Sequence, residues 1–100
     1  MKVDAIAITE RDNVATALRD IKDNEVVIVT TGDKRDKVRI IEKILFGHKF
    51  ALCDISIGDK IIKYGEVIGR ATKFVPMGTH AHIHNIESLR GRGDLQKEAI

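Results

Sequence analysis

Residues 54–70 read Asp54-Ile55-Ser56-Ile57-Gly58-Asp59-Lys60-Ile61-Ile62-Lys63-Tyr64-Gly65-Glu66-Val67-Ile68-Gly69-Arg70. Short apolar segments alternate here with Gly-Asp and Gly-Glu pairs, which is the pattern of short strands joined by tight turns. Phe50-Ala51-Leu52 adds an apolar segment just before this stretch, and Phe74–Thr79 repeats its passage from an apolar pair into a glycine turn. The sequence therefore predicts a compact, mainly β fold with short, irregular strands.

The first half of the chain carries less regular signals. Val3–Ile8 has the alternation of a half-buried strand, and the β-branched run Glu25–Thr30 is the clearest strand in the chain. Asp12–Arg19 opens with residues that cap helices, which leaves room for one short helix. Asp33–Lys37 is polar and is expected to form a loop, whereas Arg39–Leu45 suits an extended segment and an amphipathic helix equally well.

The composition is that of one ordinary globular domain. Hydrophobic residues make up 43% and charged residues 32% of the 100 residues, and no apolar run is long enough to span a membrane. The net charge of +2 comes from interleaved acids and bases, and aromatic residues are scarce, so we expect no nucleic-acid partner. Met1–Asp4 lacks the features of a signal peptide, and the single Cys53 cannot form an internal disulfide. We therefore expect a cytoplasmic protein in which Cys53 is a small core residue.

Three histidines occupy alternate positions in Gly78-Thr79-His80-Ala81-His82-Ile83-His84-Asn85. In a β-strand, His80, His82 and His84 would share one face, because successive side chains point to opposite sides. Two or three imidazoles with open positions can hold a catalytic divalent metal. The alternative is an exposed strand end whose histidines bind no ligand.

Several motifs resemble the SAF-type domain of the altronate and galactarate dehydratase family. They are Gly47-His48-Lys49-Phe50-Ala51-Leu52, Asp54-Ile55, Ile62-Lys63-Tyr64-Gly65-Glu66-Val67-Ile68-Gly69 and His82-Ile83-His84-Asn85, with Asp12-Asn13-Val14-Ala15 as a first segment. The resemblance covers about residues 12–85, which we take as the core of a single domain over residues 1–100 with a tail from 86 to 100. It implies a β-clip fold, and a sugar-acid dehydratase that uses a divalent metal, usually iron(II), with manganese(II) as the alternative.

The resemblance also implies a division of the enzyme into subunits. Some members of the family carry this domain as a small subunit beside a large one, and the similar sulfolactate sulfo-lyases are split in the same way. We therefore expect a large dehydratase subunit as the partner, a sugar acid as the substrate, and possible association of like chains. The small subunit alone is expected to be inactive, since 100 residues offer one wall of an active site.

With this resemblance, individual residues receive roles. His48, Lys49, Tyr64 and Glu66 are the candidate catalytic residues: the histidine would shuttle a proton, the lysine would pair with the substrate carboxylate, and the tyrosine would donate to a substrate hydroxyl. Glu66 could be a base, a partner of an imidazole or a surface residue. Candidate substrate-binding residues are Lys63, Asn85 and Arg90, and the candidate metal ligands are His82 and His84, then His80.

Three readings of the function remain open. The first is the small subunit of an altronate-dehydratase-like hydro-lyase, which forms a 2-keto-3-deoxy sugar acid. The second is the corresponding subunit of a sulfolactate sulfo-lyase, which loses sulfite instead of water. The third is a protein without catalysis, either a module that binds acidic sugars or an interaction protein whose histidines are incidental and whose Arg-Gly tail docks to another chain.

Overall fold

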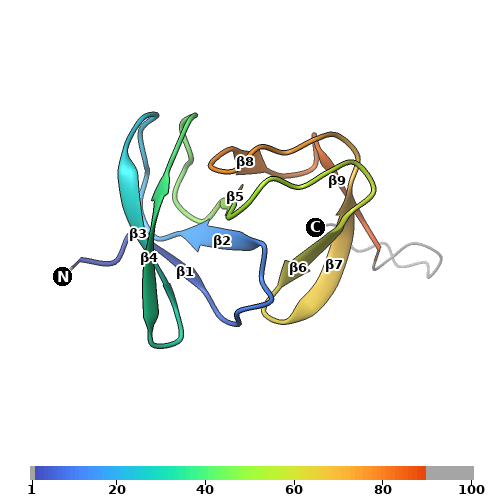
Figure 1. The fold of residues 1–100 in the computed structure, drawn as a ribbon. Coiled ribbons are helices and arrows are strands. Elements are labelled where there is room, and N and C mark those ends of the chain that lie inside the picture. Colours follow the sequence, from blue (N-terminus) through green and yellow to red (C-terminus); the bar gives the residue numbers. More distant parts are fainter. Residues whose placement is uncertain (1, 90–100) are drawn as a thin grey trace.

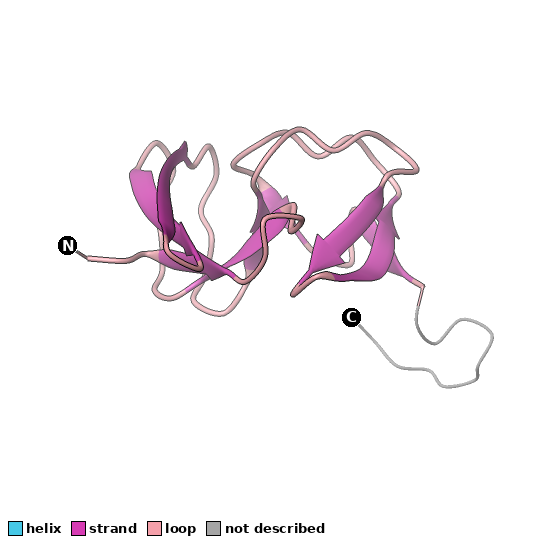
Figure 2. Cartoon of the chain, turned by 60° about the horizontal axis from the view of Figure 1, so that its bottom comes forward, coloured by secondary structure: helices cyan, strands magenta, loops and turns pink. Residues whose placement is uncertain are grey.

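The computed structural model of this protein describes residues 2–89, which form two antiparallel-rich β-sheets and no helix (Figures 1 and 2). The six-stranded sheet has the order β4-β3-β1-β2-β5-β8. Its strands are β1 (Ala5–Ala7), β2 (Val14–Ala17), β3 (Val26–Thr31), β4 (Lys34–Arg39), β5 (Lys49–Ala51) and β8 (His80–Ala81). The three-stranded sheet has the order β6-β7-β9, with β6 (Lys60–Lys63), β7 (Glu66–Ala71) and β9 (Ile86–Ser88). The prediction of a compact, mainly β fold is confirmed, and no helix within residues 2–89 has the length and apolar character needed to cross a membrane.

Two hydrophobic cores stabilise the molecule, and strand β5 contributes to both. Phe50 is fully buried in the first core, which lies within the six-stranded sheet and also contains Val27 and Val29. The next residue, Ala51, is buried in the second core together with Ile61 and Ile86 of the three-stranded sheet. Because successive residues of a strand face opposite ways, β5 lies at the joint between the two halves of the fold.

A turn of one type occurs four times in the described chain. Each copy begins with a buried β-branched residue and has its fourth residue at positive φ, between 70° and 91°. The backbone N–H of the fifth residue donates to the carbonyl of the second residue over 3.0–3.3 Å. These repeated turns are Ile21–Glu25, Ile44–His48, Ile55–Asp59 and Val75–Thr79.

The repeated turns pair with one another. Isolated bridges join Ile21 to Ile44 and Ile55 to Val75, so each pair closes one half of the fold. The fourth residue of each copy is the third residue of a four-residue β-turn, a position that here needs positive φ, which explains asparagine in the first copy and glycine in the other three. The likeness of Phe74–Thr79 to the segment at Ile55 is therefore structural and extends to two further sites.

Some local predictions are wrong. Val14–Ala17 is a strand and not a helix, because it pairs with β1 on one side and with β5 on the other. Of the expected loop from Asp33 to Lys37, only Asp33 lies in a turn; the rest belongs to β4, an exposed edge strand whose charged side chains face water. Ile86–Ser88, assigned to the tail, pairs with β7. Of the two alternatives left open for Arg39–Leu45, the helix does not form: Arg39 ends β4, and Ile44 makes an isolated bridge to Ile21. Cys53 is exposed in a turn and is not a core residue.

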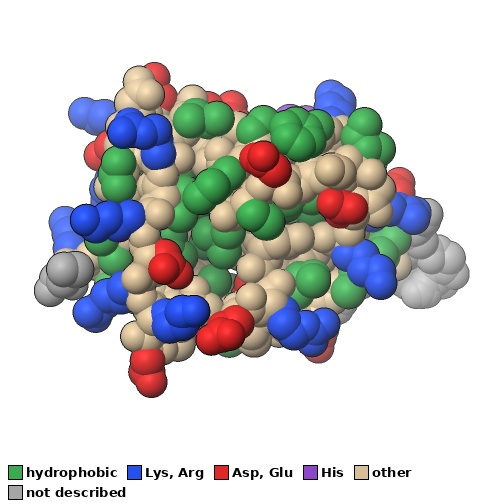
Figure 3. Space-filling model, viewed as in Figure 1, with side chains coloured by type: hydrophobic (Ala, Val, Ile, Leu, Met, Phe, Trp, Pro, Cys, Tyr) green, Lys and Arg blue, Asp and Glu red, His purple; other side chains and the backbone are tan. Residues whose placement is uncertain are grey.

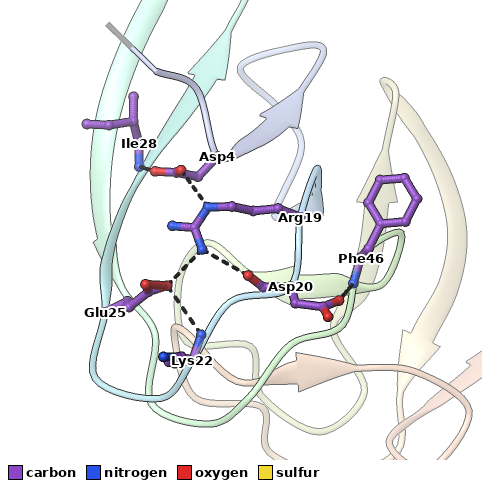
Figure 4. Close-up of polar contacts among 7 residues, drawn as sticks. All are labelled: Asp4, Arg19, Asp20, Lys22, Glu25, Ile28 and Phe46. Carbon is purple, nitrogen blue, oxygen red and sulfur yellow. Dashed lines mark hydrogen bonds and ion pairs between the residues drawn. The ribbon is translucent and has the colours of Figure 1, made fainter.

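Charged residues are mostly intermixed on the surface. On the face seen in Figure 3, Lys and Arg side chains alternate with Asp and Glu over both sheets. One network ties the start of the chain to the first repeated turn: Arg19 contacts Asp4 and Glu25, each over 3.0 Å, and Asp4 accepts the N–H of Ile28 (Figure 4). Burial alone would raise the pKa of Asp4, but these hydrogen bonds and the Arg19 charge lower it overall.

Candidate functional site

Four histidine rings gather where β5 and β8 meet. His48 ends the second repeated turn just before β5, and His80 opens β8 directly after the fourth. The two strands pair antiparallel with Phe50 opposite His80. As a result, the His48 ring stacks on the His80 ring with centroids 5.0 Å apart, and Nδ1 of His48 lies 2.9 Å from Nε2 of His80. One ring of this pair must donate and the other accept.

His82 and His84 complete the cluster from a turn and not from a strand. Strand β8 ends at Ala81, so the prediction of one strand face through residue 84 is wrong. The rings nevertheless converge: the centroid of His80 is 5.4 Å from that of His82 and 5.2 Å from that of His84. The His82 ring is also 5.3 Å from that of His48. The cluster therefore contains the three predicted histidines and the predicted catalytic His48.

Asn85 shapes the turn that carries these histidines. Its side-chain oxygen accepts the N–H of His82 over 2.8 Å, and its side-chain nitrogen donates to the carbonyl of His80 over 2.9 Å. Asn85 is buried, so these two bonds replace water at both the oxygen and the nitrogen of its side-chain amide. Asn85 thus positions the histidine turn, and a contact between Asn85 and a substrate stays a prediction. Arg90, the other predicted substrate-binding residue of this region, lies outside the described residues.

The histidines suit a metal by type but not by arrangement. Imidazole nitrogens are common ligands of divalent transition metals. Within residues 2–89, however, no three His, Cys, Asp or Glu side chains converge in a way that could hold one ion. The facing nitrogens of His48 and His80 bond to each other instead. Burial lowers the pKa of His80 and of His82, and the other histidines, together with Lys49 in the case of His82, lower it further, which favours the neutral form of both rings.

Glu42 is a neighbour of this cluster that the sequence did not reveal. Its Oε2 accepts the backbone N–H of His80 over 2.7 Å, and its charge partly opposes the fall in the pKa of that ring. The contact spans 38 positions of the chain, and no spacing or motif signals it. It depends on the fourth repeated turn, which brings Gly78 against Ile41 through the hydrogen bond from the Ile41 N–H to the Gly78 carbonyl.

Lys49 is buried beside the histidines without an acidic partner. Only 9% of its surface is exposed, and within residues 2–89 its ammonium makes no hydrogen bond or ion pair. Burial lowers the pKa of Lys49, and the nearby charge of Lys63 lowers it further. Lys49 also lies close enough to His82 to lower the pKa of that ring. The predicted catalytic lysine therefore lies beside the histidine cluster, since it pairs with Ala81 between His80 and His82.

Tyr64 and Glu66 lie on the β6–β7 hairpin, and neither contacts a histidine within the described chain. Tyr64 is half exposed, has a φ of 56° and lies under the Nζ of Lys63, which is 4.8 Å from the centre of its ring. Buried Asp12 holds this hairpin in place by accepting the N–H of Tyr64 over 3.0 Å and that of Gly65 over 2.8 Å. Asp12 is a second residue that sequence reasoning missed, since it was taken for the cap of a helix.

The comparison with known families agrees with this arrangement. Residues 3–89 match the sequence model of the altronate/galactarate dehydratase SAF domain. The chain belongs to this family. The resemblance drawn from the His-Lys, Tyr-Gly-Glu and His-x-His-Asn motifs is therefore confirmed, and the mainly β architecture of two sheets is consistent with a β-clip SAF domain.

Curated relatives of this SAF domain differ in length. The chain is 41% identical to the altronate dehydratase of Escherichia coli over 80% of its own length and 15% of that protein. The altronate dehydratase of Bacillus subtilis is 37% identical over 83% of the chain and 16% of the relative. The (2R)-sulfolactate sulfo-lyase subunit alpha of Paracoccus pantotrophus is 39% identical over 65% of the chain and 98% of the relative. The chain thus spans about one-sixth of the two dehydratases but nearly all of one relative named as a subunit.

Proposed function

We propose that this chain is the small subunit of a two-subunit sugar-acid dehydratase that removes water from altronate or a similar polyhydroxy carboxylate. The observation that carries the proposal is the convergence of four histidines and a buried lysine in a chain of the altronate/galactarate dehydratase family. The two altronate dehydratases match 80% or more of the chain, which favours loss of water over loss of sulfite. The small-subunit form is suggested by the sulfo-lyase subunit alpha, which this chain spans almost completely.

The site supplies the two functions that this elimination requires. A proton leaves the carbon next to the carboxylate, hydroxide leaves the neighbouring carbon and is protonated to water, and the enol product tautomerises to a 2-keto-3-deoxy acid. An imidazole can act as a general base, and we assign this task to His48, which is bonded to His80. Lys49 would neutralise the negative charge that grows on the substrate carboxylate as the proton leaves.

A divalent metal, iron(II) or manganese(II), remains part of the proposal, with His82 and His84 as its ligands from this chain. Such an ion would act as a Lewis acid toward substrate oxygens. Since residues 2–89 contain no three-ligand set, the remaining ligands would have to come from the large subunit. Tyr64 and Glu66 would then serve a more distant part of the substrate or the interface.

A protein partner is also suggested by the repeated turns. Three of them expose an apolar side chain at the third position, namely Phe46 at 65%, Ile57 at 69% and Met77 at 41%. Exposed side chains of this size are common at protein interfaces. We propose a large subunit as this partner and a cytoplasmic location for the complex; association of two copies of the chain is the alternative.

The test is isolation of the native complex from its source cells, followed by assay of altronate loss with and without iron(II). We expect a metal-dependent 2-keto-3-deoxy acid from the complex and none from the chain alone. His48→Gln should lower kcat by about 10²- to 10⁴-fold, whereas Lys60→Met, at an exposed lysine of β6, is the matched control. Release of sulfite from sulfolactate would favour the sulfo-lyase, and a chain that purifies alone and binds sugar acids without turnover would favour the binding module.

A further inference from the structure

We infer that His80 is the positioning residue of the proposed base His48, and that it reserves Nε2 of His48 for the substrate proton. The inference rests on the proposed function, in which His48 removes the proton next to the carboxylate. It goes beyond that function in naming the reacting nitrogen and in giving His80 a task other than metal binding.

The two rings meet in the geometry of a hydrogen bond. Nδ1 of His48 lies 2.9 Å from Nε2 of His80, and the ring planes are inclined by 28°. The ring centres are 5.0 Å apart, which is close to the nitrogen separation plus the radii of the two rings. Both nitrogens therefore lie near the line between the ring centres, along which the N–H or the lone pair of each nitrogen points. A single proton lies between them.

The backbone of both residues is fixed, so the pair is preorganised. The N–H of His80 donates to Oε2 of Glu42 over 2.7 Å, and the carbonyl of His80 accepts from Nδ2 of Asn85 over 2.9 Å. The carbonyl of His48 accepts the N–H of Ala17 over 2.9 Å. Hydrogen bonds of this kind behind a reacting group hold its ring in one orientation. His80 is therefore a firm support for the His48 ring.

Only one nitrogen of His48 is left for chemistry. The bond to His80 occupies Nδ1, and within residues 2–89 the other nitrogen, Nε2, makes no hydrogen bond or ion pair. An imidazole accepts a proton only on a nitrogen that carries a lone pair. His48 is therefore a base when its hydrogen lies on Nδ1 and is donated to the lone pair on Nε2 of His80, whose own hydrogen then lies on Nδ1.

This arrangement assigns a place to each proton of the elimination. The substrate proton moves to Nε2 of His48, and the electron pair of the C–H bond forms the carbon–carbon double bond as hydroxide leaves. The imidazolium of His48 keeps its Nδ1–H on His80, whose lone pair stabilises the new positive charge. The proton then passes from Nε2 to the hydroxide and forms water. His80 thus acts through His48 and not on the substrate.

Long-range proton–nitrogen NMR spectra of the full chain, recorded where the imidazoles are neutral, show which nitrogen of His48 carries the hydrogen. We expect Nδ1–H in the wild-type chain. His80→Leu removes the acceptor and should move the hydrogen to Nε2, the form that a free imidazole side chain prefers. His80→Gln offers an amide oxygen and should keep the hydrogen on Nδ1. Lys60→Met, at an exposed lysine of β6, is the control and should match the wild type.

Kinetics of the native complex give the second readout. His80→Leu should lower kcat for altronate by about 10- to 100-fold with little change in KM. His80→Gln should recover most of this loss, because it restores the acceptor. Equal losses of kcat in the two variants, with an unchanged His48 tautomer, would mark a merely structural role and overturn the inference.

Hydrogen on Nε2 of His48 in the wild-type chain would overturn the inference even if no variant folds. Restoration of the His80→Leu complex by excess iron(II) would make His80 a metal ligand and overturn it as well. The proposed function is tested separately. If the complex dehydrates altronate while His48 carries Nε2–H, the dehydratase proposal stands and the inference fails. If His48 carries Nδ1–H but the complex dehydrates no sugar acid, the dehydratase proposal fails and the tautomer assignment alone stands.

Discussion

Replacement of Gly78 by alanine examines the turn that delivers His80 to the histidine cluster. Gly78 has a φ of 85°, and a Cβ at this position would overlap the backbone carbonyl oxygen of Arg39. Gly58 is the matched control, because it occupies the same position of another repeated turn with a φ of 91° and no heavy atom within 4 Å of a Cβ built there. The two substitutions therefore share the same backbone strain and differ only in the clash.

The structure sets the size of the two effects. An alanine in the left-handed region costs about 1–2 kcal/mol, and the reduced freedom of the unfolded chain returns about 0.4–1 kcal/mol. Gly58→Ala should therefore lower the free energy of unfolding by about 1 kcal/mol. At Gly78, the clash involves backbone, which cannot rotate away as a side chain could. Overpacking of this kind adds about 1–3 kcal/mol, so Gly78→Ala should cost about 2–4 kcal/mol.

Urea unfolding followed by circular dichroism would measure both values. For a domain of this size, each kcal/mol corresponds to a fall in melting temperature of about 4–8 °C, so thermal unfolding gives an independent reading. NMR should also show that Gly78→Ala shifts the ring signals of His80 and that Gly58→Ala leaves them unchanged. Equal destabilisation by the two substitutions would refute the reasoning, since it would mean that the Arg39 backbone moves aside without a loss of stability.

Three further substitutions and one control test other parts of the fold by urea unfolding. Lys49→Met should raise the free energy of unfolding at pH 7 by about 1–3 kcal/mol, since it removes an unpaired buried charge. The pKa of Lys49 is lowered in the folded state. Between that lowered pKa and the unfolded value of about 10.4, the unfolded chain therefore holds more protons than the folded chain does. The stability of the wild type should rise with pH in that range, and the advantage of the variant should shrink. Asp12→Ala leaves backbone donors of two turns unpaired and should cost about 2–4 kcal/mol; a loss below about 1 kcal/mol would contradict the role given to this carboxylate. Arg19→Met should cost about 1–2 kcal/mol because it leaves Oδ1 of buried Asp4 without its partner. Arg70→Met, in an exposed ion pair, should change stability by less than about 0.5 kcal/mol, and similar values for the two would contradict the role given to Arg19.

The fold class was predictable because its signals are local. Glycine turns and short apolar runs of residues 50–70 indicate short strands wherever they occur in a chain. Strand β4 was not predictable in this way, since its charges are tolerated only because it lies at the edge of the sheet. Strand β2 was misread because Asp12 resembles a helix cap. The Asp12 carboxylate instead accepts the N–H groups of Tyr64 and Gly65, which lie more than 50 positions away in the sequence.

The candidate site, too, was predictable only where its signals are local. The convergence of His80, His82 and His84 follows from their spacing, even though a turn and not a strand carries the last two. The contribution of His48 depends on the pairing of β5 with β8, a register that single-sequence reasoning does not supply. The position of Lys49 beside the histidines likewise depends on this register, which pairs Lys49 with Ala81.

The pairing of the repeated turns has a consequence for how the molecule assembles. Ile21 pairs with Ile44 and Ile55 with Val75, so both contacts close loops of similar length within their own halves of the chain. The entropy of loop closure varies only slowly with length, and the two closures differ by about 0.1 kcal/mol. The entropy of loop closure therefore favours neither half over the other in folding. Strand β5 joins them, with Phe50 in one core and Ala51 in the other, and the histidine and lysine beside it exist as a site only after that union. A ligand held there would link the two halves further, in addition to the bonds from Asp12 to the β6–β7 hairpin and the pairing of β8 with β5.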